Sequence, residues 1–267
     1  NFYYALYSQL FKLNKIKLFK KLSIINHVKF KKLPNSLYFF EQIIKLCEKN
    51  KIIFNFKEKK ILEVGGGEFW GLMPFFSKQK SKSFTNIDIG INSFVLKSNF
   101  IKLRYLNKIS EYTSKNDFEN FQYDNYKCKI ENFSSDEKFD FVVSISCLEH
   151  IDAIESFFVN IKKNLSTASK HIHLVNFSNH IHKEEPFKYL YEMSPNDFIK
   201  KYDAKINFLR IEDYKKILKK LNYSYSIINV RTSKVDSSRI YKYWEKYKNM
   251  DELSVVSAII VIDGHNQ

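Results

Sequence analysis

The chain contains little glycine, proline or cysteine. Its 267 residues include six glycines, four prolines and three cysteines. Cys47, Cys128 and Cys147 are far apart and form no CxxC pair, which argues against a disulfide framework and a zinc knuckle. The sequence also lacks a run of about 18 uncharged apolar residues, the length that a membrane-spanning helix needs. Early and frequent lysines distinguish the first residues from a signal peptide, so we expect a soluble protein of the reducing cytoplasm.

Arginine is scarce among the basic residues. Four of the 44 lysines and arginines are arginine, and the formal net charge is +15. Such a charge suits an acidic partner, for example nucleic acid, anionic lipid or a phosphorylated metabolite. The accompanying excess of Ile, Asn, Phe and Tyr is, however, the bias expected of an A+T-rich genome, and no RGG, zinc-finger or RNP-like motif is present. We therefore expect no nucleic-acid partner.

The pattern of apolar residues predicts an α/β fold. Residues 1–58 have the pattern of amphipathic helices interrupted by Pro34; they form a helical extension that packs over a sheet edge or, alternatively, associates weakly with a membrane surface. In residues 59–267, strand-like runs alternate with helical patterns, which indicates a doubly wound, mostly parallel sheet with helices on both faces. An irregular segment covers residues 178–207. The seven predicted strands are ILEVG, SFTNID, YKCKIEN, FDFVVSIS, HIHLVNF, YSYSIINVR and VVSAIIVID.

Four of the six glycines lie within ILEVGGGEFWG, residues 61–71. Glycine tolerates positive φ and leaves room for a ligand against the backbone, so this segment predicts a sharp turn from a strand into a helix beside a nucleotide-type cofactor. A P-loop would end in Gly-Lys-Ser/Thr, but EFW stands there instead. A dinucleotide fold would have GxGxxG, whereas the spaced glycines here are Gly65, Gly67 and Gly71.

The acid-x-Gly-x-Gly-x-x-x-Gly pattern that begins at Glu63 resembles motif I of the class I S-adenosylmethionine-dependent methyltransferases. Two further motifs follow in the family's order. Asp88 ends the predicted strand SFTNID, and FDFVVSISCLEHI, residues 139–151, is similar to the family's fourth-strand segment FDxVxxxxxLEH. The resemblance covers residues 58–177 well. It implies the Rossmann-like methyltransferase fold and S-adenosylmethionine as cofactor.

The resemblance implies cofactor roles for residues of the first two motifs. Gly65, Gly66 and Gly67 would let the methionine part of the cofactor approach the turn. Glu63, beneath them, would hold its amino end through neighbouring backbone or water. Asp88 would accept both ribose hydroxyls, because a carboxylate offers two acceptor oxygens.

Two more cofactor contacts are implied after the third and fourth strands. The family places an acid there for the adenine amino group. Lys129 stands where one alignment expects this acid and Glu131 follows two places later, so Glu131 is the candidate. Backbone around Ser146 would meet the methionine ammonium.

Methyl transfer is an in-line displacement, for which a protein aligns the acceptor and excludes water. A hydroxyl acceptor usually also needs a base, and histidine has a suitable pKa. His180, beyond the fifth strand, and His150, at the mouth of the fourth, are the candidate catalytic bases. His173 alternates with His171 on a strand and is either a substrate contact or a packed core histidine. No metal is expected, because the histidines lack helical or CxxC-type ligand spacing.

The stretch from His173 to His180 is similar to an HxxDxxDH signature of methyltransferases from bacterial surface-polysaccharide gene clusters. Both aspartates are asparagines here, Asn176 and Asn179, which weakens the case for a carboxylate-bound metal. NFLRIED, residues 207–213, resembles a second short pattern of these enzymes.

Asn207 and Arg210 are therefore candidate substrate-binding residues. Arginine binds phosphate in a bidentate manner, so Arg210 suits a substrate phosphate; the alternative is a salt bridge with Asp213 at a helix start. The resemblance implies O-methylation of a small, nucleotide-activated sugar or related phosphorylated precursor of capsule or lipopolysaccharide. One alternative is a nucleic-acid methyltransferase, which net charge favours although no Asn/Asp-Pro-Pro-Tyr motif follows the fourth strand. The other is a non-catalytic methyltransferase-like scaffold.

Overall fold

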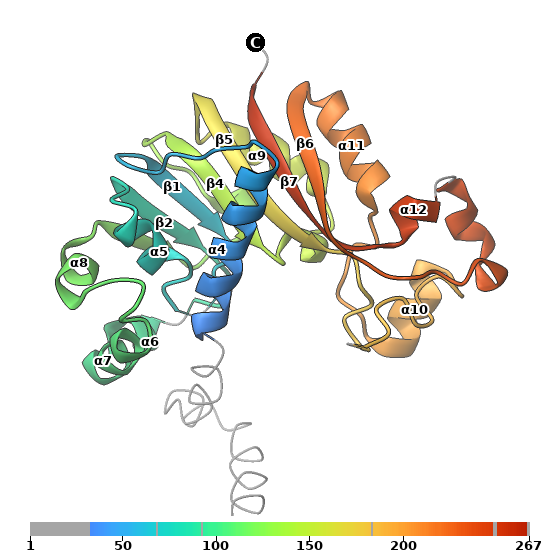
Figure 1. Cartoon of the computed structure of the whole chain (residues 1–267), viewed down its shortest axis with the longest axis horizontal. Coiled ribbons are helices and arrows are strands. Elements are labelled where there is room, and N and C mark those ends of the chain that lie inside the picture. The colour runs from blue at the N-terminus through green and yellow to red at the C-terminus, as the bar shows by residue number, and fades with distance from the viewer. Residues whose placement is uncertain (1–32, 68, 92, 183, 248–249, 266–267) are drawn as a thin grey trace, which may run out of the picture.

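The computed structural model of this chain describes residues 33–265, apart from 68, 92, 183, 248 and 249. Its strands are β1 (Lys60–Val64), β2 (Ser83–Ile87), β3 (Tyr123–Tyr126), β4 (Phe139–Ile145), β5 (Leu165–Asn176), β6 (Tyr223–Thr232) and β7 (Val255–His265). They form one seven-stranded sheet with the order β3-β2-β1-β4-β5-β7-β6 (Figure 1). Strand β7 is antiparallel to both β5 and β6, whereas the other neighbouring pairs are parallel. The predicted mostly parallel sheet is confirmed.

Helices cover both faces of this sheet (Figure 1). The α-helices are α4 (Leu33–Lys49), α5 (Met73–Lys78), α6 (Ser93–Lys97), α7 (Asn99–Lys108), α8 (Lys115–Asn120), α9 (Ile154–Lys162), α10 (Pro195–Tyr202), α11 (Ile211–Lys220) and α12 (Met250–Leu253). The 3-10 turns of the described part of the chain are η1 (Ile130–Asn132), η2 (Leu148–His150), η3 (Ser237–Arg239) and η4 (Lys242–Lys246). Within the described residues, none of these helices has the length and apolar character needed to cross a membrane.

Side chains of the central strands alternate between two apolar cores. On β7, Ile259 and Val261 join the core that includes residues of α4 and α5. Ile260 and Ile262 join the opposite core, which includes residues of α9 and α11. This alternation follows from the two-residue period of a strand. Helices cover both faces of the sheet. A ligand can therefore contact polar groups of the sheet only at the ends of the strands.

A third apolar cluster lies beyond the carboxyl end of β5. Its buried members are Phe187, Leu190, Tyr191, Phe198, Ile206, Phe208, Trp244, Tyr247, Leu253 and Val256. We call the described residues of 178–208 and 233–254 the lobe. The main-chain N–H of Phe177 donates to the carbonyl of Val256 at 2.8 Å, which joins the end of β5 to the start of β7 at its base. In Figure 1, α10 and α12 mark the lobe on the right-hand side.

Two segments beyond β2 differ from the sequence-based expectation. The third strand ends at Tyr126, where the predicted strand YKCKIEN begins, and Ile130–Asn132 forms η1 instead. The expected irregular segment contains α10. The hydroxyl of Ser194 accepts a hydrogen bond from the N–H of Asp197, and Pro195 occupies the first helical position, so this helix has both common start signals.

The N-terminal extension is described from residue 33 onward, and the helices expected in residues 1–32 lie outside the described residues. Pro34 lies in the first turn of α4, a position that its missing N–H permits. Leu37, Phe40 and Ile43 of α4 belong to the same core as β1 and β2. This part of the extension therefore packs on the sheet.

Candidate functional site

The glycine turn after β1 encloses the carboxyl group of Glu63. Glu63 is 3% exposed, and its Oε2 accepts a hydrogen bond from the main-chain N–H of Leu72 at 2.9 Å. A Cβ atom on Gly66 would lie 2.5 Å from this Oε2, and one on Gly71 would lie 1.8 Å from it. The buried carboxyl group therefore requires glycine at both positions, and it fixes the path of the chain into α5.

Gly65 and Gly67 have similar backbone angles but different surroundings. Their φ values are +83° and +80°. A Cβ atom on Gly65 would lie 2.5 Å from Sγ of Cys147, so the loop after β4 excludes a side chain there. A Cβ atom on Gly67 would meet no described atom within 4 Å. The open space beside Gly67 is what a ligand needs in order to approach the backbone.

Burial raises the pKa of Glu63 from 4.5 to about 8. Between these values the folded chain keeps a proton that the unfolded chain releases, so the contribution of this group to stability falls as the pH rises. We expect the wild-type protein to lose free energy of unfolding relative to Glu63→Gln over this pH range. Urea unfolding of both proteins at the two ends of the range measures the difference. A difference that does not change with pH would contradict a buried, protonated carboxyl group.

A pocket of about 520 Å³ opens beside the turn. It includes five residues that the sequence places in the site, from the loops after β1, β2, β3 and β4. Its volume falls within the range of about 300–1,000 Å³ that is usual for small-molecule sites. The lining residues are Val64, Gly65, Ile87, Asp88, Ile89, Cys128, Lys129, Ile130, Glu131, Ser146, Cys147, His150, Ile151, Asp152 and Ala153. The carboxyl ends of these parallel strands are where α/β sheets bind nucleotide cofactors.

Asp88 connects this pocket to the glycine turn. Its carboxylate accepts hydrogen bonds from the N–H of Gly67 at 2.7 Å and of Gly90 at 2.5 Å. A carboxylate has about four lone-pair positions, so acceptor capacity remains for hydroxyl donors. Asp88 and the open backbone at Gly67 therefore fit the ribose and methionine parts of the cofactor that the resemblance implies.

Asp88→Ala is expected to weaken S-adenosylmethionine binding by about 10- to 100-fold, because hydrogen bonds to a charged group contribute about 1.5–3 kcal/mol. The substitution also releases the main chain of Gly67. Calorimetric titration measures the change. Asp124→Ala, at an exposed position of β3, is the matched control and should bind as the wild type does. Equal affinity in all three proteins would exclude Asp88 from the cofactor site.

The remaining predicted cofactor contacts lie on the same pocket. Lys129 and Glu131 both line it, and of the two only the carboxylate can accept a hydrogen bond from an adenine amino group. The backbone of Ser146 has a φ of +48°, and its N–H donates to the carbonyl of Leu174 at 2.9 Å. An ammonium group only donates, so the carbonyl of Ser146 is the group that suits it.

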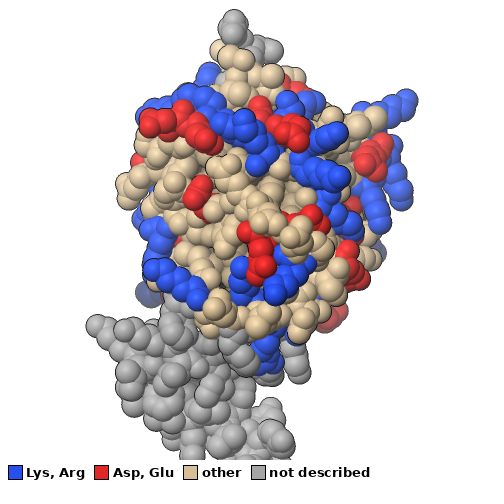
Figure 2. Space-filling model, turned by 90° about the vertical axis from the view of Figure 1, so that its left-hand side faces the viewer, with Lys and Arg blue, Asp and Glu red and all other residues tan. Residues whose placement is uncertain are grey.

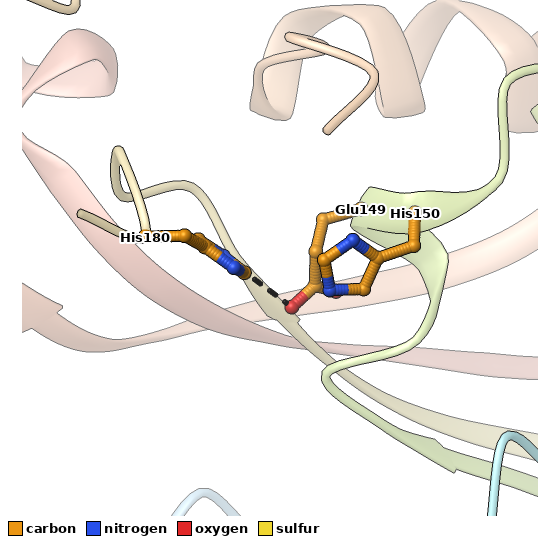
Figure 3. Close-up of side chains that lie close together, drawn as sticks. All are labelled: Glu149, His150 and His180. Atoms are coloured by element: carbon orange, nitrogen blue, oxygen red, sulfur yellow. Dashed lines mark ion pairs between the residues drawn. The ribbon is translucent and has the colours of Figure 1, made fainter. Parts of the chain in front are cut away.

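Glu149, His150 and His180 form a cluster beside this pocket (Figure 3). Glu149 and His150 belong to η2, which follows β4, whereas His180 lies in the lobe. Nε2 of His180 is 3.9 Å from Oε1 of Glu149. The two imidazole rings meet edge to face with their centroids 5.1 Å apart. Because His150 also lines the pocket, the cluster is adjacent to the cofactor position.

The carboxyl group in this cluster is buried and poorly solvated. Burial raises the pKa of Glu149 to about 7. The nearby main chain of Asn176 and hydroxyl of Ser146 oppose this rise in the pKa. Neither group, nor any other described residue, is placed well enough to form a hydrogen bond with a carboxyl oxygen of Glu149. Burial, followed by the neighbouring His150, lowers the pKa of His180. The cluster thus combines an imidazole that resists protonation with a carboxyl group whose oxygens have no hydrogen-bond partner among the described residues.

Asn207 holds η2 in place. Its Nδ2 donates to the carbonyls of Leu148 and Ile151, both at 2.8 Å, and its main-chain N–H donates to the carbonyl of Glu149 at 2.8 Å. These bonds tie the lobe to the two cluster residues on η2. Asn207 therefore positions η2, and its predicted contact with substrate stays a prediction.

Asn179 fixes the segment that carries His180. It is fully buried, and its side chain makes four hydrogen bonds to the main chain of Glu185, Lys188, Ile181 and His182. Two of these bonds are donated by Nδ2, which a carboxylate could not provide. This explains asparagine at one position where the similar signature has aspartate. The backbone of His180 has a φ of +58°, a strained value for a non-glycine residue that this bonding maintains.

His173 does not reach the pocket. It is 0% exposed, its Nδ1 lies 2.8 Å from the hydroxyl of Ser144, and its Nε2 lies 3.3 Å from His171. Burial lowers its pKa to about 3. The structure thus places His173 in the core and corrects the expectation of a substrate contact.

Arg210 is also enclosed by protein. It is 1% exposed, one guanidinium nitrogen donates to the carbonyl of Phe177, and the guanidinium carbon lies 5.4–5.8 Å from three ring centroids, those of Phe177, Tyr191 and Trp244. Asp213 accepts from the main-chain N–H of Arg210 at 2.8 Å. The side chain therefore packs the lobe against β5, which argues against both a phosphate contact and the alternative side-chain salt bridge.

Sequence reasoning did not single out Glu149 or Cys147. Glu149 directly precedes His150 in LEH, so its closeness to His180 follows once the ends of β4 and β5 are known to be neighbours. The contact of Cys147 with Gly65 depends on the packing of two loops, for which the sequence has no local signal.

The comparisons with known proteins agree with this geometry. A family model described as "Methyltransferase domain" matches residues 38–226, a range that contains Glu63, Asp88 and the whole cluster. No curated protein sequence matches the chain.

Several solved structures share the fold. The plantazolicin methyltransferase BpumL, in complex with a desmethylPZN analog and SAH, aligns with a TM-score of 0.52 at 14% identity over 97% of this chain and 95% of that chain. A protein from Listeria monocytogenes, described as an S-adenosylmethionine-dependent methyltransferase, has a TM-score of 0.51 at 14% identity over 84% and 99%. Phosphoethanolamine N-methyltransferase 2 from Haemonchus contortus, with S-adenosylhomocysteine, has a TM-score of 0.50 at 13% identity over 85% and 53%. At these identities the likeness shows the fold alone.

Proposed function

This chain belongs to the methyltransferase-domain family and uses S-adenosylmethionine, and from that premise we propose that it methylates a hydroxyl group of a small sugar. The proposed acceptor is a nucleotide-activated sugar or a related phosphorylated precursor of a surface polysaccharide. The observation that carries the hydroxyl assignment is the Glu149–His150–His180 cluster beside the cofactor pocket.

The residues around the pocket divide the cofactor between them. Asp88 would bind the ribose, the carbonyl of Ser146 would bind the ammonium group, and Glu131 would bind the adenine amino group. Gly67 would leave room for the methionine part of the cofactor beside the backbone. S-adenosylmethionine supplies an electrophilic methyl group and leaves as S-adenosylhomocysteine when the acceptor oxygen takes that methyl. The task of this chain is then to align the hydroxyl group and to remove its proton.

The cluster is suited to proton removal. His180 is the proposed proton acceptor, because its Nε2 faces the cluster and Glu149 lies 3.9 Å away, where a carboxylate stabilises the imidazolium that forms. His150 is the second candidate, since it reaches both the cluster and the pocket. A nitrogen acceptor that is already neutral would need no such group, which favours oxygen.

Support for a sugar comes from the resemblance of residues 173–180 and 207–213 to polysaccharide-cluster enzymes. In this chain both stretches shape the acceptor side of the site, because they position His180 and η2 respectively. The alternative, a nucleic-acid acceptor, is favoured by the net charge of +15. On the face seen in Figure 2, however, basic and acidic side chains are intermixed around a largely uncharged centre. A continuous basic surface of the kind that tracks a phosphate backbone is not seen on that face.

The proposal is tested by measuring S-adenosylhomocysteine formation with panels of nucleotide sugars, sugar phosphates and RNA oligonucleotides. Turnover with a nucleotide sugar or sugar phosphate, with the new methyl group on oxygen by mass spectrometry and NMR, is the expected result. Methylated RNA, or methylation of nitrogen, would overturn the proposal and leave the family assignment intact.

A further inference from the structure

Glu149, His150 and His180 direct metal-ligand atoms towards one point. One such atom from each residue lies within 4.8 Å of the other two, and Figure 3 shows the three side chains converging from η2 and the lobe. Ligands about 2.1 Å from a tetrahedral ion lie about 3.4 Å apart. Side-chain rotations that move the ligand atoms by about 1.5 Å or less would bring them from their present separation to this spacing.

The carboxyl group of Glu149 is the strongest indication that something is bound here. Glu149 is 3% exposed, and neither of its oxygens has a hydrogen-bond partner among the described residues. Leaving a buried polar group without a partner costs about 1–3 kcal/mol, and more for a charged group. A cation between the three side chains would complete the coordination of this carboxylate.

The imidazole of His150 is already oriented as a ligand. Its Nδ1 is hydrogen-bonded to the carbonyl of Lys205, which accepts the Nδ1 proton and leaves the lone pair on Nε2. Metal-bound histidines usually donate their other ring nitrogen to a carbonyl or carboxylate in this way. The main chain directly after His180 is held by the buried side chain of Asn179, which accepts hydrogen bonds from the N–H groups of Ile181 and His182. Both histidines are exposed, but a hydrogen bond orients the ring of His150, and the main chain next to His180 is fixed.

We propose that Glu149, His150 and His180 bind one divalent transition-metal ion. Two imidazole nitrogens and one carboxylate suit Zn²⁺, Mn²⁺, Fe²⁺ or Co²⁺ better than Mg²⁺ or Ca²⁺, which prefer oxygen ligands alone. Three protein ligands leave at least one coordination position open. The carboxylate comes from η2, so this site does not depend on the residues at positions 176 and 179, which are asparagine.

Ion binding goes beyond the proposed function and does not depend on the acceptor. If the acceptor is a hydroxyl group, an ion at the open position would lower the pKa of that group, and its proton would pass to solvent water instead of His180. If no ion binds, His180 remains free to act as the base. An experiment can therefore contradict ion binding without contradicting O-methylation of a sugar, and the reverse also holds.

The test uses the full chain after treatment with a chelator and dialysis. Calorimetric titrations with Zn²⁺ and with Co²⁺, together with the visible absorption spectrum of bound Co²⁺, measure the stoichiometry and the affinity without any acceptor. The variants are Glu149→Gln, His150→Gln and His180→Gln. His182→Gln is the matched control, because His182 lies in the same loop but its ring packs against Tyr189. Circular dichroism and thermal unfolding establish that each variant is folded.

We expect one ion site in the wild type, an affinity loss of at least about tenfold in each of the three cluster variants, and no loss in His182→Gln. Bound Co²⁺ should also lose its visible spectrum in the cluster variants. No stoichiometric binding by the wild type, or equal binding by the folded variant His150→Gln, would overturn the proposal.

Discussion

His180→Ala is expected to lower turnover by about 100-fold or more while leaving the affinity for S-adenosylmethionine unchanged, since positioned proton transfer contributes about 10²- to 10⁴-fold. Burial lowers the pKa of His180, and Nε2 of its imidazole lies 3.9 Å from Oε1 of Glu149. His180 is not among the residues that line the cofactor pocket, so its loss removes no cofactor contact. Initial rates and calorimetric titration of the same preparation separate the two effects.

The control for His180→Ala is His182→Gln. The main-chain N–H of His182 bonds to Asn179, as does that of Ile181, and this bond survives a change of side chain. Turnover close to that of the wild type is expected for the control. Wild-type turnover in His180→Ala would remove His180 from the mechanism and leave His150 as the base.

Gly71→Ala should destabilise the fold by about 3 kcal/mol or more, because it adds a steric overlap to a strained backbone angle. The backbone of Gly71 has a φ of +51°, and an added Cβ would lie 1.8 Å from Oε2 of Glu63. That oxygen cannot move away freely, since the carboxyl group is buried and bonded to the N–H of Leu72. Urea unfolding gives the change in free energy, and the loss should be accompanied by weaker cofactor binding.

Gly67→Ala is the matched substitution for Gly71→Ala. Gly67 also has a positive φ, of +80°, but no described atom lies within 4 Å of the added Cβ. Gly67→Ala therefore adds backbone strain alone, and we expect it to lower the free energy of unfolding by about 1 kcal/mol. Equal destabilisation by the two substitutions would show that backbone angle alone decides, and that the buried carboxyl group does not require glycine at 71.

The sequence predicted the sheet well because its strands carry strong local signals. VVSAIIVID forms β7, which is buried between two neighbours, and its apolar side chains serve both cores. The third strand was misplaced because YKCKIEN contains the same residue types as a strand. Tyr126 belongs to β3, whereas Ile130 turns into η1. Only pairing with β2 distinguishes the two, and pairing is not a local property.

The site could be predicted where a motif has one physical purpose. Asp88 and Gly65 line the pocket as expected, because the end of a strand and the first glycine of the turn have fixed places in this fold. Histidines and Arg210 were harder, since the same residue types serve as ligands and as packed core. His173 and Arg210 are enclosed, whereas His180, seven residues beyond His173, reaches the cluster. Burial distinguishes the packed residues from the site residue. Burial here depends on the lobe, which is built from two segments that are distant in the sequence.

The central claim is that the pocket lined by Gly65 and Asp88 holds S-adenosylmethionine, and calorimetric titration of the purified chain tests it most directly. We predict saturable, one-to-one binding of S-adenosylmethionine and S-adenosylhomocysteine with dissociation constants in the micromolar range, and no binding of NAD. Binding of neither sulfur compound, or binding that Asp88→Ala leaves unchanged, would contradict the account.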